Sequence, residues 1–131
     1  MKITGLAHFT IPFTDLKRAQ AFYENILGMK VVQPERGKNG MVFLDAGGDC
    51  VILAKVNAPI STVRMQNIHH AFKVAREDYL LARTELQQKN IPIVFEEDRQ
   101  GGAVNGPRFY FHDPDGNVLE IIDLTSYIGA A

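Results

Sequence analysis

The chain has 131 residues, of which 46% are hydrophobic and 22% charged, with a formal net charge of -1. This composition suits one compact domain with its own core over residues 1–131, and the scattered basic residues exclude a stripe that would bind nucleic acid. No stretch is long and apolar enough for a membrane span or a signal peptide, and Cys50 is the only cysteine. We therefore expect a cytoplasmic protein without disulfides, and no catalytic role for Cys50.

The first half of the chain predicts a strand, a helix and three further strands. The segment HFTIPF, which begins at His8, alternates as a strand does. Apolar residues at helical spacing predict a helix over residues 15–27, with Thr14 or Asp15 as its N-cap and Gly28 at its end. Strand candidates follow in MKVVQP, GMVFLDA and CVILAKV.

The second half repeats this order. The segment HHAFKV from His69 resembles HFTIPF in outline, and a helix is predicted over residues 78–90, followed by strand candidates in IPIVFEE, PRFYFHD and NVLEIIDL. Each half is thus a βαβββ module, module one over about 1–57 and module two over about 67–125, joined near residues 57–66. A module alone would expose the apolar face of its sheet, so we expect an α+β fold in which the two modules bury these faces together.

Three polar residues in these strands form a candidate metal site. His8 and His69 occupy corresponding places in the repeat, whereas alternation directs His70 to the helix-packing side. Glu120 is a carboxylate in an apolar strand, and a buried carboxylate needs a partner. Each residue alone is typical of a hydrogen-bonded core position. Together, two histidines and a carboxylate suit a facial site for Fe(II) or Mn(II), with Zn(II) and Ni(II) as alternatives.

The chain resembles the vicinal oxygen chelate superfamily, also called the glyoxalase, bleomycin-resistance and type I extradiol dioxygenase group. The resemblance covers nearly the whole chain and rests on LAHFTIPFTDLKRAQAFYENILGMKVV, IHHAFKV and PRFYFHDPDGNVLEI. In the family, the first histidine of each half and the glutamate after the DPDG turn are metal ligands, which here implies His8, His69 and Glu120. The resemblance further implies two βαβββ modules forming a cupped mixed sheet around the metal, a small-molecule substrate and a homodimer.

Branches of the family differ in their remaining site residues. Glyoxalase I and methylmalonyl-CoA epimerase take a fourth ligand from a place that here falls near Ile52 or Leu53, so both reactions are disfavoured. The stretch from Phe109 to Glu120 resembles the extradiol dioxygenase signature, although the histidine expected before Tyr110 is missing. The resemblance therefore implies a metal-dependent enzyme, with dioxygenase-like cleavage as the leading reaction.

Thiol transfer of the fosfomycin-resistance type is the first alternative. That family has a threonine two residues after the first histidine and a tyrosine ten residues before the glutamate, which match Thr10 and Tyr110. Where it grips a phosphonate with lysine, serine and arginine, this chain has Gln100, Val104 and Gly129, so fosfomycin itself is disfavoured. A further alternative is non-catalytic binding of a bleomycin-type drug, although such relatives usually lack the ligand set. The third alternative is a subunit or regulatory domain that keeps the metal only for structure.

One predicted face of the strand before the DPDG turn carries Arg108, Tyr110 and His112. The metal would bind two adjacent substrate oxygens as a Lewis acid and stabilise developing negative charge. Tyr110 is a candidate catalytic residue, because its hydroxyl could donate a proton or hydrogen bond. The resemblance implies Thr10 as a second catalytic residue. Arg108 and His112 are candidates for substrate binding. The alternatives are a packed tyrosine, a solvated arginine and a surface histidine capped by a turn. The glycine-rich loop over residues 98–106 is either a lid or only a connection.

Overall fold

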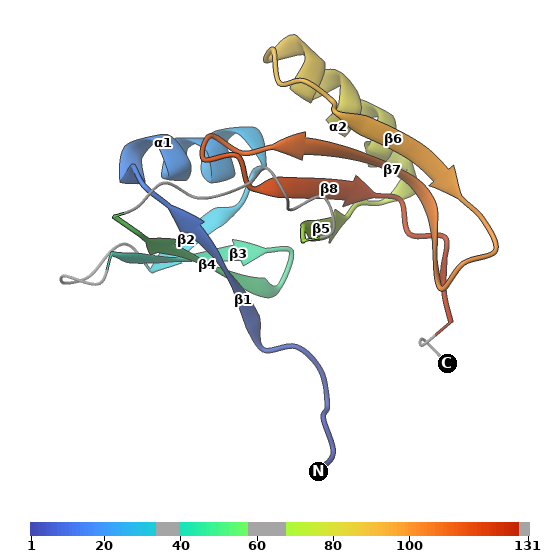
Figure 1. Ribbon diagram of the computed structural model, residues 1–131, viewed down its shortest axis with the longest axis horizontal. Helices are drawn as coiled ribbons and strands as arrows, with labels where there is room; N and C mark the ends of the chain where they lie inside the picture. Colours follow the sequence, from blue (N-terminus) through green and yellow to red (C-terminus); the bar gives the residue numbers. More distant parts are fainter. Residues whose placement is uncertain (34–39, 58–67, 129–131) are drawn as a thin grey trace. The chain divides into compact units, whose positions relative to one another are not determined.

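The computed structural model describes residues 1–33, 40–57 and 68–128, which form two compact units (Figure 1). The units span residues 1–60 and 61–131. Each has one mixed sheet, so the predicted α+β class is confirmed. The predicted connection near 57–66 lies outside the described residues apart from Asn57. No helix among the described residues is long and apolar enough to cross a membrane.

In the first unit the sheet has the strand order β1-β4-β3-β2, with β1 parallel to β4 and the other pairs antiparallel. The predicted ends of the helix are confirmed, because the carboxylate of Asp15 accepts a hydrogen bond from the backbone N–H of Arg18 (2.9 Å) and Gly28 has a φ of 71°. The helix itself changes from α to π geometry part-way. The elements are β1 (His8–Phe13), α1 (Leu16–Ala21), η1 (Phe22–Ile26), β2 (Lys30–Gln33), β3 (Met41–Ala46) and β4 (Asp49–Lys55).

The faces of β1 differ in burial as alternation predicts. Ile11 and Phe13 are buried, whereas His8 and Thr10 are exposed. Residues that are paired in register lie on the same face of a sheet, and β4 pairs Ile52 with Thr10. His8 and Thr10 therefore share one face of the first sheet, and β4 presents the aliphatic side chain of Ile52 beside them.

In the second unit the sheet has the order β5-β8-β7-β6, with β5 parallel to β8. Strand β6 begins later than the segment IPIVFEE predicts, after the stretch that contains Pro92, which has no N–H to give to a ladder. The short strand β9 pairs with β7 and was not predicted. The elements are β5 (His70–Lys73), α2 (Arg76–Gln88), β6 (Phe95–Arg99), β7 (Val104–His112), β8 (Val118–Ile122) and β9 (Ser126–Tyr127).

Helix α2 lies along one face of the second sheet (Figure 1). The ring of Tyr79 on α2 contacts that of Phe109 on β7, with 5.4 Å between the centroids. Phe111 lies two residues after Phe109 and therefore on the same face of the sheet. Leu119 is the register partner of both Phe111 and His70, so His70 lies on this face as well. The prediction that His70 points to the helix-packing side is thus confirmed. Tyr110 and Glu120, which are paired in register, occupy the opposite face.

Gly106 lies where β7 passes close to the chain after β8. Its φ is +127°, and a Cβ at this position would lie 2.0 Å from the carbonyl oxygen of Asp123. Gly101 also has a positive φ, of +72°, but a Cβ there would meet nothing within 4 Å. Adding a Cβ at Gly101 therefore costs only backbone strain, whereas adding one at Gly106 costs both strain and steric overlap.

We predict that Gly106→Ala lowers the free energy of unfolding by about 3 kcal/mol or more, because strain and overlap add. Gly101→Ala, the matched control, carries only the left-handed backbone penalty of about 1–2 kcal/mol. Chemical denaturation of both variants measures the difference. Equal losses would contradict the close approach of β7 to Asp123.

Candidate metal centre

The hairpin of β7 and β8 brings Tyr110 and Glu120 together, and Asp113 fixes its turn. One carboxylate oxygen of Asp113 accepts hydrogen bonds from the backbone N–H groups of Asp115 and Asn117, both at 2.9 Å. The other oxygen accepts one from the Asn117 amide at 2.8 Å. A side chain that cross-links its own turn favours one hairpin register. In this register Tyr110 lies directly opposite Glu120.

His69 and Glu120 meet on the face of the sheet away from α2. His69 Nε2 lies 2.9 Å from Glu120 Oε2, and the Glu120 side chain is 3% exposed. Two ligands that bind one ion at about 2.1 Å and at right angles are separated by about 3 Å. His69 Nδ1 is buried and has no hydrogen-bond partner among the described residues. The 2.9 Å contact is that of a hydrogen-bonded or ion-paired imidazole and carboxylate, and the same spacing also suits two neighbouring ligands of one metal ion.

Arg108 is buried beside this pair and is not the solvated arginine expected from the end of a strand. Its Nη1 lies 3.4 Å from Glu120 Oε1. Its Nη2 donates to the carbonyl of Val104 at 2.8 Å and its Nε to that of Gly106 at 3.3 Å. Each nitrogen of the guanidinium therefore faces an oxygen of the protein, and a role in substrate binding stays a prediction.

The sequence left Tyr110 as either a catalytic donor or a packed tyrosine. In the structure its ring packs against other rings, and its hydroxyl lies near the Glu120 carboxylate. Its ring is 5.2 Å from that of His69 and 5.7 Å from that of Phe95, centroid to centroid. Burial, and then the negative charge of Glu120, raise the pKa of Tyr110, whereas Arg108 acts in the opposite sense. The phenol therefore stays protonated at neutral pH and is able to donate a hydrogen bond.

The remaining predicted site residues are His112 in the second unit and His8 and Thr10 in the first. His112 is exposed near the end of β7, and its register with Val118 puts it on the same face as Glu120. His8 and Thr10 belong to the first unit. Over residues 1–33, 40–57 and 68–128, no group of three His, Cys, Asp or Glu side chains is placed to hold a metal. The ligand role of His8 stays a prediction.

Two local features, one in each unit, were not anticipated from the sequence. Cys50 is the register partner of His8 and shares its face, which the apolar run around the cysteine did not reveal. The predicted loop over 98–106 is shorter, because β6 extends to Arg99 and β7 begins at Val104. Its base is fixed by the Asn105 amide, which donates to the carbonyl of Gly102 at 2.8 Å and to Ser126 Oγ at 2.9 Å.

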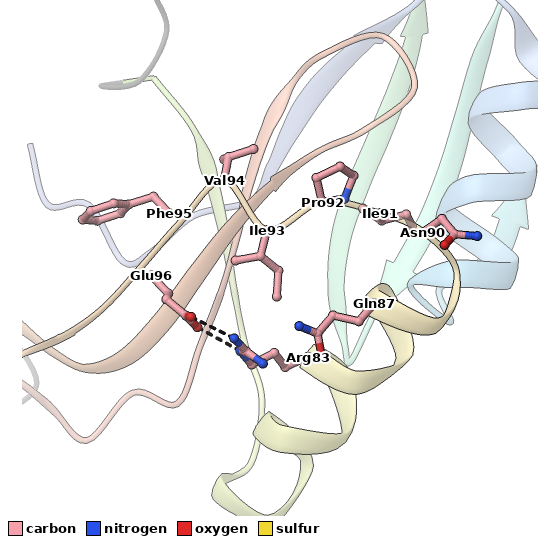
Figure 2. Close-up of a pocket in the computed structure, with 9 residues that line it drawn as sticks. All are labelled: Arg83, Gln87, Asn90, Ile91, Pro92, Ile93, Val94, Phe95 and Glu96. Carbon is pink, nitrogen blue, oxygen red and sulfur yellow. Dashed lines mark hydrogen bonds and ion pairs between the residues drawn. The ribbon is translucent and has the colours of Figure 1, made fainter.

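A pocket of about 510 Å³ lies between α2 and β6, and it is distinct from the histidine–carboxylate pair. Figure 2 shows Arg83 and Glu96 facing each other at one side, where the guanidinium makes two hydrogen bonds of 2.8 and 2.9 Å to the carboxylate. Its lining is otherwise mostly aliphatic or amide and contains no histidine or cysteine. The pocket therefore lacks the imidazole and thiolate ligands that transition metals prefer.

A family model described as Glyoxalase/Bleomycin resistance protein/Dioxygenase superfamily matches residues 5–121. The chain belongs to this superfamily. Within the superfamily, it is 29% identical over 121 residues to the glutathione transferase FosA of Serratia marcescens, covering 91% of this chain and 80% of that protein. It is 31% identical over 126 residues to the mitochondrial methylmalonyl-CoA epimerase of Bos taurus, covering 87% and 70%.

Solved structures of superfamily members share the fold. The fosfomycin resistance protein FosX of Listeria monocytogenes matches with a TM-score of 0.79 and 22% identity, covering 95% of this chain and 94% of that one. A point mutant of FosX, solved with Mn(II) and 1S,2S-dihydroxypropylphosphonic acid, matches with a TM-score of 0.75 and 21% identity over 93% and 94% of the two chains. The fold is therefore one that holds a divalent metal in a relative.

The adjacent histidines of this member give a direct test of the site. Burial, and then the neighbouring His69, lower the pKa of His70, whereas the charge of Asp113 acts in the opposite sense. The two adjacent histidines occupy opposite faces of the sheet, and only His69 pairs with Glu120. We predict that His69→Ala abolishes stoichiometric binding of Mn(II) or Co(II), because only His69 faces Glu120. His70→Ala, the matched control, should retain it. Isothermal titration calorimetry on both folded variants measures the effect, and equal losses would contradict the assignment of faces.

Proposed function

We propose that this member of the superfamily is a divalent-metal-dependent enzyme that acts on a small molecule through two adjacent oxygens. The observation that carries the proposal is the 2.9 Å separation of His69 Nε2 and Glu120 Oε2. A facial site needs a third ligand. His8 supplies it in the proposal, because it occupies the place in the first module that corresponds to His69 and is exposed on its strand.

The side chains around the pair suit catalysis at a charged centre. When bound, the metal would supply a Lewis acid for the substrate oxygens. The protonated hydroxyl of Tyr110 is the group placed to donate a proton or hydrogen bond as negative charge develops. Val118 and Ile122, which flank Glu120 on its face, are 8% and 4% exposed and exclude water. In such a setting each electrostatic contact is stronger than it would be in water.

Two reactions fit this arrangement, and different observations favour them. The stretch around Tyr110 and Glu120 resembles the extradiol signature, which favours oxygen-dependent cleavage at Fe(II) or Mn(II). The relationship to FosA favours addition of a thiol. Thr10 and Tyr110 match the pattern of that family. The aliphatic Ile52 beside Thr10 disfavours the four-ligand chemistry of glyoxalase I and the epimerase. A homodimer remains part of the proposal.

Metal binding followed by turnover tests the proposed function. The protein is loaded with Fe(II) or Mn(II) and assayed for oxygen uptake with catechols, for glutathione consumption with a set of small epoxides, and for binding of bleomycin. We expect Glu120→Gln to weaken metal binding by more than about 100-fold and to abolish turnover. The loss should exceed the roughly 10- to 100-fold effect of removing a group that only orients a ligand, because Glu120 would itself be a ligand. Glu96→Gln is the matched control, because Glu96 lies on β6 and its register partner Phe109 places it on the face of α2, away from Glu120.

Three outcomes of these assays are distinguishable. Wild-type protein that retains no metal under any loading condition would overturn the proposal. Metal binding with oxygen uptake or thiol consumption, lost in Glu120→Gln but not in Glu96→Gln, supports it and selects the reaction. Tight binding of bleomycin without turnover of either substrate class would replace it with the drug-binding alternative.

A further inference from the structure

The two oxygens of Glu120 have different partners. Oε2 faces His69 Nε2 at 2.9 Å, whereas Oε1 faces Arg108 Nη1 at 3.4 Å. The side chains of Arg108 and Glu120 are 4% and 3% exposed, so water screens their attraction little. The carboxylate is therefore held from both sides, and one oxygen already has a cationic partner before any metal is bound.

The position of the Arg108 guanidinium is set by its own strand. The carbonyls of Val104 and Gly106 accept hydrogen bonds from two of its nitrogens. Gly106 has the positive φ of +127° and lies against the carbonyl of Asp123, so the backbone that offers these carbonyls is itself constrained. If Arg108 turned away from Glu120, a buried charge and two carbonyls would lose their partners, which is costly.

We propose that Arg108 is a positioning residue that retains Oε1 of Glu120, so that the carboxylate binds the metal through Oε2 alone. This inference rests on the proposed metal centre. A carboxylate is able to ligate with one oxygen or with both. With one, three protein ligands leave three of six positions on the ion open. Three positions accommodate two substrate oxygens and a second reactant, whereas a chelating Glu120 would leave only two.

The number of exchangeable waters on Mn(II) tests this role independently of activity. We compare water proton relaxation in Mn(II)-loaded wild-type protein with that in Arg108→Met and Arg108→Gln. Both variants free Oε1 to bind the ion, so the relaxation enhancement per bound Mn(II) should fall by about one third, from three waters to two. Arg108→Lys keeps a cation near Oε1 and should lie closer to wild type.

The matched control is Arg83→Met, which removes a guanidinium paired with Glu96 on the same unit but away from the site. It should leave the relaxation unchanged. An enhancement that is the same in wild type and in both neutral Arg108 variants, with Mn(II) bound, would overturn the role of Arg108 and leave the proposed function intact. A wild-type protein that binds no Mn(II) would overturn both.

Discussion

The buried carboxylate of Glu120 is the constraint on which the rest of the site depends. A charge in the middle of an apolar strand is destabilising unless other groups compensate for it. Here a histidine faces one oxygen and an arginine the other. Because Arg108 lies on β7 and His69 directly precedes β5, the compensation requires β5, β7 and β8 to be in one particular register. The polar site and the sheet therefore stabilise each other.

The backbone devices of the second unit serve this register. Asp113 cross-links the turn between β7 and β8 and so sets Tyr110 opposite Glu120. At the other end of β7, Gly106 permits the chain after β8 to approach and presents a carbonyl to Arg108. The hairpin is thus fixed at both ends, and the groups that face the carboxylate lie between the two fixed points.

The two faces of the second sheet carry different kinds of side chain, with packed aromatic rings on one and polar groups on the other. Phe109 and Phe111 pack on the side of α2, while Tyr110, between them in sequence, faces Glu120. His69 and His70 divide in the same way. Members of this superfamily with different reactions share the fold, as the likeness to both FosA and an epimerase shows. The fold alone therefore does not decide the reaction, which depends on the side chains of the site.

The sequence alone determined the two βαβββ modules, the ends of the first helix and the faces of the strands that carry His8, His69 and Glu120. These follow from local periodicity and caps, which a single segment contains. It did not determine the π-helical turn of η1, the late start of β6, strand β9, or the burial of Arg108. These depend on contacts between segments far apart in the chain. Alternation places Arg108 and Glu120 on one face, but only the register between β7 and β8, and the carbonyls that direct the guanidinium, decide that Arg108 faces one carboxylate oxygen and leaves the other to His69.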